Sequence, residues 1–100
     1  MIQVEKIEAV IDKDATGRGY LLDARGKMCV MGGLLAAAGV DLEDFRGRAS
    51  LSGENERILR LEYGLTDGQI SELIGENDSW RTTRARRRHL KLRLRQLATE

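Results

Sequence analysis

The sequence predicts a predominantly α-helical α+β domain, with about five helices around a buried Gly/Ala-rich helix and one short β-hairpin. Three observations support this fold class. The chain has 100 residues, enough for one core and too few for a second domain. It is 41% hydrophobic but only 4% aromatic, so aliphatic side chains must fill that core. Its apolar residues recur mainly at helical spacing between glycine-containing breaks. Residues 1–100 are therefore expected to form one compact domain.

The N-terminal segment Ile2–Lys13 is the first expected element. Val4, Ile7 and Ile11 recur at helical spacing in it, which predicts an amphipathic helix. The glycine-containing residues 15–19 then break the period.

A turn sequence follows at Asp23–Gly26. Aspartate at the first position can accept hydrogen bonds from the turn backbone, and glycine suits the last position, as in a type I turn. We therefore expect a hairpin of two very short strands, Tyr20–Leu22 and Lys27–Cys29. Such a short ribbon would need helices packed against it.

The segment Met28–Ala38 carries no charge on any side, which is typical of a buried helix. Gly32 and Gly33 would let neighbouring backbones approach closely, and Gly39 suits a left-handed cap. Further along, Asp41 can cap a short turn, and Ser52 can cap a third helix that is interrupted or ended by Gly64.

Thr66 has the spacing of a capping box with Gln69 and predicts a short fourth helix that stops at Gly75. The segment His89–Arg95 then alternates polar and apolar residues, which also fits a strand. Leu97 breaks that alternation, and the residues are good helix formers, so a basic C-terminal helix over residues 82–98 is favoured. Its cap could be Asp78, Ser79 or Thr82, with Trp80 as a packing anchor.

Charge is divided unevenly along the chain, although its net value is only +1. Residues 1–80 hold nine Lys and Arg against fifteen Asp and Glu, and residues 81–100 hold eight against one. The two parts therefore carry −6 and +7. This division predicts a strong dipole and a locally positive surface at the C-terminal helix.

On a helical wheel, four basic residues fall within an arc of about 60° and form a stripe roughly 16 Å long, while leucines occupy another face. The stripe consists of Arg84, Arg88, Lys91 and Arg95, and Arg81 and Arg87 flank it. Arginine binds phosphate or carboxylate in bidentate fashion, so the stripe is a candidate contact surface for a partner or nucleic acid. The alternative is a solvated face whose charges pair with acids of the same chain or of a second copy. Repulsion between like charges four residues apart favours an external partner.

The densest acidic group, Asp41, Glu43 and Asp44, could imitate phosphates toward a basic host surface. The stronger interpretation is a helix cap followed by first-turn acids that the helix dipole favours.

Catalytic groups are scarce. Cys29 and His89 are the only cysteine and histidine, and they lie far apart in the sequence, so neither a nucleophile pair nor a metal site is expected. Gly17–Gly19 is too short for a phosphate-binding loop. We predict no enzyme activity, no cofactor and no metal. The longest apolar stretch has 13 residues, too few to cross about 30 Å of hydrocarbon, so a cytoplasmic protein without membrane contact is expected.

The run Gly19–Leu34 resembles a family of small bacterial and phage proteins of unknown function. Those proteins combine such a hairpin and glycine-containing helix with a later Trp-Asn-Asp segment and a C-terminal helix. Here the order differs, because Asn77 and Asp78 precede Trp80. The resemblance covers roughly residues 19–98 and implies an α-rich fold and a phage or mobile-element origin, without an activity.

Two functions follow as expectations. In the first, the protein is a non-enzymatic phage or mobile-element interaction protein that binds and inhibits a host protein–nucleic-acid machine, as anti-CRISPR proteins do. Its partner would be a host protein or ribonucleoprotein complex. In the second, it is a small regulator whose basic C-terminal helix binds nucleic acid directly, with an affinity that falls steeply with salt.

Overall fold

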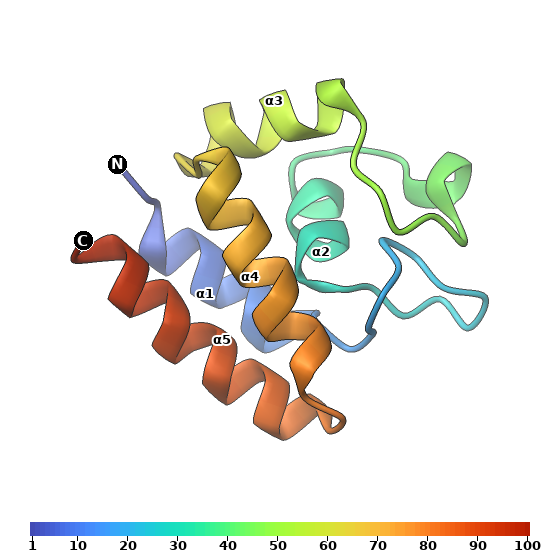
Figure 1. The fold of residues 1–100 in the computed structure, drawn as a ribbon. Coiled ribbons are helices and arrows are strands. Elements are labelled where there is room, and N and C mark those ends of the chain that lie inside the picture. The colour runs from blue at the N-terminus through green and yellow to red at the C-terminus, as the bar shows by residue number, and fades with distance from the viewer.

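Five α-helices and one 3₁₀ helix make up the computed structural model, which describes residues 1–100 (Figure 1). The elements are α1 (Val4–Lys13), α2 (Val30–Ala37), η1 (Leu42–Phe45), α3 (Gly53–Tyr63), α4 (Asp67–Ser79) and α5 (Thr83–Ala98). The expectation of a predominantly helical domain is confirmed. Helices α4 and α5 pack as a hairpin, α1 lies against α5, and α2 contacts α1, α3 and α4.

Helix α2 is the central element, as predicted. Every residue from Val30 to Leu35 is buried. Gly32 explains why this helix needs glycine, because a Cβ there would lie 2.0 Å from the carbonyl oxygen of Leu21. The helix ends before Gly39, whose φ of 93° is the left-handed conformation expected of a glycine cap.

The predicted β-hairpin is wrong, although its turn is present. The Asp23 carboxylate accepts hydrogen bonds from the main-chain N–H groups of Arg25 and Lys27, at 2.8 and 2.9 Å. No strand flanks this turn. The segments predicted as strands, Tyr20–Leu22 and Lys27–Cys29, are irregular.

Burial explains why the strands do not form. Leu21 and Leu22 are both buried, whereas consecutive side chains of a strand point to opposite faces. Two main-chain hydrogen bonds still cross the turn, from the N–H of Asp23 to the carbonyl of Lys27 and from the N–H of Cys29 to the carbonyl of Tyr20. The backbone of Leu21 and Leu22 pairs instead with the segment after η1. The N–H of Leu21 donates to the carbonyl of Arg48 at 3.0 Å, and the N–H of Gly47 donates to the carbonyl of Leu22 at 2.8 Å. Only one isolated bridge results, between Leu22 and Arg46.

The caps of α3 and α4 are those that the sequence predicts. The hydroxyl of Ser52 accepts from the N–H of Asn55, Gly64 ends α3 with a φ of 70°, and Thr66 forms a full capping box. The predicted end of α4 at Gly75 is wrong, because the helix continues to Ser79.

Asn77 accounts for the longer α4. Its side chain is buried and accepts a hydrogen bond from the N–H of Val30 at 3.0 Å, and it donates to the carbonyl of Gly17 at 3.1 Å. These contacts hold the last turn of α4 against the start of α2. The sequence offers three caps for the next helix, and Thr82 is the one used.

Helix α5 is the predicted basic helix, and the alternative of a strand is excluded. Leu90, Leu94 and Leu97 are buried against the core. None of the helices has both the length and the apolar character needed to cross a membrane.

Candidate functional site

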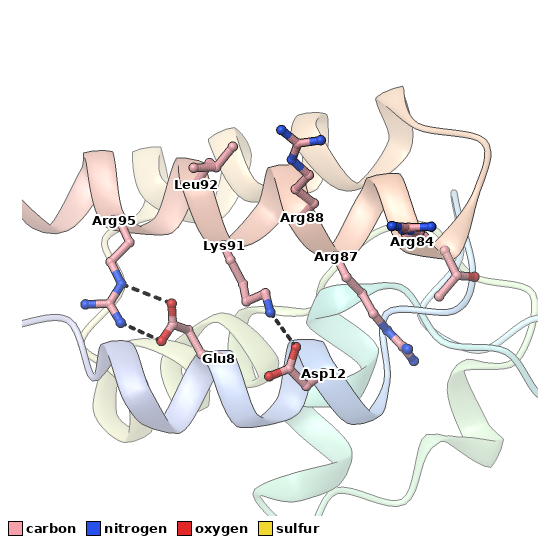
Figure 2. A pocket seen from close by; sticks show the side chains of 9 residues that line it. Glu8, Asp12, Arg84, Arg87, Arg88, Lys91, Leu92 and Arg95 are labelled. Atoms are coloured by element: carbon pink, nitrogen blue, oxygen red, sulfur yellow. Dashed lines mark hydrogen bonds and ion pairs between the residues drawn. The ribbon is translucent and has the colours of Figure 1, made fainter.

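The C-terminal half of α5 is neutralised by its neighbours. Lys91 forms an ion pair with Asp12 at 2.7 Å, and Arg95 forms a bidentate pair with Glu8 whose shortest distance is 2.7 Å (Figure 2). Both carboxylates belong to α1. On the opposite side, Arg93 pairs with Glu72 of α4, also at 2.7 Å. In this half of the stripe, Lys91 and Arg95 therefore pair with acids of the same chain, which is the alternative to an external partner.

The N-terminal half of α5 is different, because no carboxylate lies within 4.0 Å of its cations. Arg84 and Arg88 are exposed, as is Arg81 just before the helix cap. Figure 2 shows the Arg88 side chain directed away from α1. We refer to Arg81, Arg84 and Arg88 as the basic patch.

Arg87 occupies an intermediate position. Its guanidinium donates to the main-chain carbonyls of Asp14 and Lys13, at 3.0 and 3.2 Å, and so caps the C-terminal end of α1 (Figure 2). Carbonyls at a helix C-terminus attract cations without neutralising their full charge. Arg87 is thus half-buried and positions α5 on α1 while adding to the positive potential.

All four residues of the predicted stripe border one groove between α1 and α5, of about 880 Å³. The groove is also lined by Arg87, Thr83, the carboxylates of Glu8 and Asp12, and a single apolar residue, Leu92. Leu92 is 52% exposed, which is unusual for a large apolar side chain among charges. The stripe is therefore one surface with a mixed-charge end and a purely basic end.

Arg86 is a residue of this region that the sequence reasoning overlooked. It is only 2% exposed, and its guanidinium donates to four carbonyls. These belong to Asn77, Ala15, Trp80 and Arg81. Burial lowers the pKa of Arg86, with a smaller contribution from the charge of Arg18. The signal that could have identified it is its spacing, because Arg86 lies four residues before Leu90 on the buried face of α5.

Trp80 is a packing anchor, as expected. Its ring stacks on that of His89, with centroids 3.6 Å apart and planes inclined by 3°, and its N–H donates to Glu76 at 3.0 Å. This stack gives the single histidine, a residue of α5, a packing role against the indole.

Two of the three carboxylates in the acidic group Asp41, Glu43 and Asp44 interact with other groups of the chain. Asp41 caps η1 by accepting from the N–H of Glu43 at 3.0 Å, and Glu43 pairs with Arg46 at 2.8 Å. The hydrogen bond from Arg46 holds the pKa of Glu43 below its usual value. Asp44 is exposed. The first-turn interpretation of these acids is the one that fits, and they do not join the basic patch.

Cys29 caps α2, where its sulfur accepts from the N–H of Gly32 at 3.5 Å. Burial raises the pKa of this thiol, so it stays protonated at neutral pH. No group of three His, Cys, Asp or Glu side chains is arranged to hold a metal ion.

Comparison with known protein families, curated proteins and solved structures finds no match to this chain. The geometry of α5 and its neighbours is therefore the basis of the function proposed below.

Proposed function

We propose that the protein is a non-enzymatic nucleic-acid-binding protein that contacts the phosphate backbone with its basic patch. The observation that carries this proposal is the absence of any carboxylate within 4.0 Å of Arg81, Arg84 and Arg88. In the C-terminal half of the same helix, Lys91, Arg93 and Arg95 are paired with carboxylates, so unpaired charge is concentrated at the N-terminal end of α5. Guanidinium groups bind phosphate oxygens in bidentate fashion.

The size of the patch predicts the character of binding. Arg84 and Arg88 are four residues apart, which corresponds to about 6 Å along α5, and Arg81 precedes the helix cap, so the patch offers three cations for about three phosphates. Three such contacts give a salt slope of about −2.7 on duplex DNA. The affinity is expected to be modest and independent of base sequence, because backbone contacts do not read bases.

Binding of labelled duplex and single-stranded oligonucleotides across a salt series tests the proposal. Arg84→Glu together with Arg88→Glu should lower affinity by more than about tenfold, since two phosphate contacts are replaced by repulsion. The matched control is Arg48→Glu with Arg57→Glu, which reverses the same charge at exposed positions outside α5. Equal affinities for the two double variants would contradict a phosphate-binding patch.

A second candidate function is favoured by Leu92. An exposed leucine next to arginines suits a protein partner, since interfaces combine an apolar centre with a polar rim. In this case the protein is an inhibitor of a host protein–nucleic-acid machine, of the kind that phage proteins such as anti-CRISPRs provide, and α5 occupies a site on that machine.

The two functions make different predictions for Leu92→Arg. The inhibitor predicts capture of a nucleoprotein complex that survives nuclease treatment and is lost with Leu92→Arg, with negligible binding to bare nucleic acid. The nucleic-acid-binding protein predicts that Leu92→Arg retains or increases affinity for oligonucleotides, because it adds a cation beside Arg88.

A further inference from the structure

A second group of cations surrounds a hollow beside the start of α5. The hollow has a volume of about 510 Å³ and lies between residues 16–27 and the end of the α4–α5 connection. Its charged lining consists of Arg18, Arg25, Lys27, Arg81, Arg86 and Asp23. Five cations and one carboxylate thus line the hollow, and a second carboxylate, that of Asp78, lies at its rim, where it accepts from the N–H of Gly19. None of the five cations is within 4.0 Å of any carboxylate.

The carboxylate in the lining of the hollow, that of Asp23, has a structural role. Asp23 accepts hydrogen bonds from the main-chain N–H groups of Arg25 and Lys27, so it closes the turn that carries both cations. The hydrogen bond from Lys27 is the main cause that keeps the pKa of Asp23 below its ordinary value. Its negative charge is shared with the turn backbone and offsets only part of the surrounding positive charge.

Arg86 is a largely buried residue of the lining, and not all of its N–H donors are used within the protein. A guanidinium has five N–H donors, two of them on each terminal nitrogen. The Nη1 atom of Arg86 makes one hydrogen bond, to the carbonyl of Ala15 at 3.2 Å. At least one N–H of this buried side chain therefore has no partner in the protein. A buried donor of this kind is stabilised by an acceptor from a ligand.

The rim of the hollow is held in place by hydrogen bonds. The N–H of Gly17 donates to the carbonyl of Met28 at 2.8 Å, and the N–H of Gly19 donates to the carboxylate of Asp78 at 2.9 Å. The side-chain amide of Asn77 donates a hydrogen bond to the carbonyl of Gly17. A site whose backbone is already ordered loses less entropy on binding a ligand.

We propose that this hollow binds one phosphate group of a nucleic-acid strand, as the continuation of the basic patch. Arg81, the residue of the basic patch that precedes the helix cap, also lines the hollow, so the two surfaces share one cation. The lining offers donors of the type that phosphate oxygens accept, and a phosphate would supply the missing acceptor to Arg86. The inference rests on the proposed function, because it assigns a further contact to the same ligand.

The first test is an NMR titration with inorganic phosphate, with chloride at matched ionic strength as control. Saturable shifts are expected at the amides of Gly17 and Gly19 and at the Nε–H of Arg86. Arg25→Gln together with Lys27→Gln should abolish them, since both side chains are exposed and make no ion pair that the fold requires. Shifts that grow linearly, that persist in this double variant, or that chloride reproduces would overturn the proposed site.

The second test uses oligonucleotides with a 5′-phosphate or a 5′-hydroxyl. If the hollow takes a strand end, the phosphorylated strand should bind about tenfold more tightly, and Arg25→Gln with Lys27→Gln should remove that difference. If it takes an internal phosphate, both strands should bind equally and both should weaken by about tenfold in the double variant. Unchanged affinity for both strands would overturn the inference.

Failure of the inference is distinguishable from failure of the proposed function. Oligonucleotide binding that depends on Arg84 and Arg88 but not on Arg25 and Lys27 would support the basic patch and contradict only the phosphate site in the hollow. Saturable phosphate shifts without oligonucleotide binding would contradict the proposed function and would show that the hollow binds phosphate but not a nucleic-acid strand.

Discussion

The two halves of α5 are similarly basic in sequence but differ in their partners within the chain. Toward its C-terminus, Lys91, Arg93 and Arg95 each meet a carboxylate of α1 or α4 at 2.7 Å. Toward its N-terminus, Arg84 and Arg88 meet none. The difference lies in the neighbouring elements, which offer carboxylates beside one half and main-chain carbonyls beside the other. A run of basic residues therefore indicates a binding surface only where its side chains have no ion-pair partner within the same chain.

The largest effect is expected from the one arginine of the N-terminal half that is buried. Arg86→Met should lower the free energy of unfolding by about 3 kcal/mol, because two buried and two partly buried carbonyls lose their donor. Urea denaturation followed by circular dichroism measures this. The exposed neighbour serves as the matched control, since Arg88→Met should change stability by no more than about 0.5 kcal/mol. Equal effects at the two positions would show that Arg86 has no special structural role.

Releasing the paired half should extend the binding surface. Glu8→Gln together with Asp12→Asn removes both carboxylates from the groove and frees Lys91 and Arg95. Affinity for oligonucleotides is then expected to rise by about tenfold, as two cations become available to phosphate.

The control for this gain is Glu54→Gln with Glu56→Gln, the same charge change in the first turn of α3, which Figure 1 shows away from the start of α5. An equal gain in both variants would mean that net charge, and not the groove, determines affinity.

A smaller effect on stability is expected from the ion pair of Lys91. Both side chains of the pair are partly exposed, so Lys91→Met should cost less than about 1 kcal/mol. A double-mutant cycle with Asp12→Asn measures the coupling between the two charges. A coupling indistinguishable from zero would show that the contact does not stabilise the α1–α5 interface.

Most helices were predictable because their ends depend on local chemistry. Ser52, Thr66 and Thr82 satisfy N–H groups of their own first turns, and Gly64 adopts its left-handed conformation at the end of its own helix. The end of α4 was not predictable, because Asn77 is held by partners 47 and 60 residues away in the sequence. The incomplete hairpin has the same origin, since Tyr20 and Asp23 bond across the turn whereas Leu21 and Leu22 bond to the distant segment after η1.

The sequence predicts that the basic residues of the candidate site form a stripe, but it does not predict which of them remain without an ion-pair partner. Glu8 and Asp12 are four residues apart on α1, and so are Lys91 and Arg95 on α5. Because α1 and α5 contact each other in antiparallel order, Glu8 meets Arg95 and Asp12 meets Lys91. The spacing is visible in the sequence, whereas the pairing of these two helices depends on the whole core.

The salt dependence of oligonucleotide binding distinguishes the two halves of α5, because its slope counts the phosphates that the protein contacts. Two matched variants each lose two cations: Arg84→Gln with Arg88→Gln, and Lys91→Gln with Arg95→Gln. The first should reduce the steepness of the salt slope by about two, and the second should leave the slope unchanged, because its cations already have partners. Equal reductions in both variants would contradict the division of α5 into a binding half and a paired half.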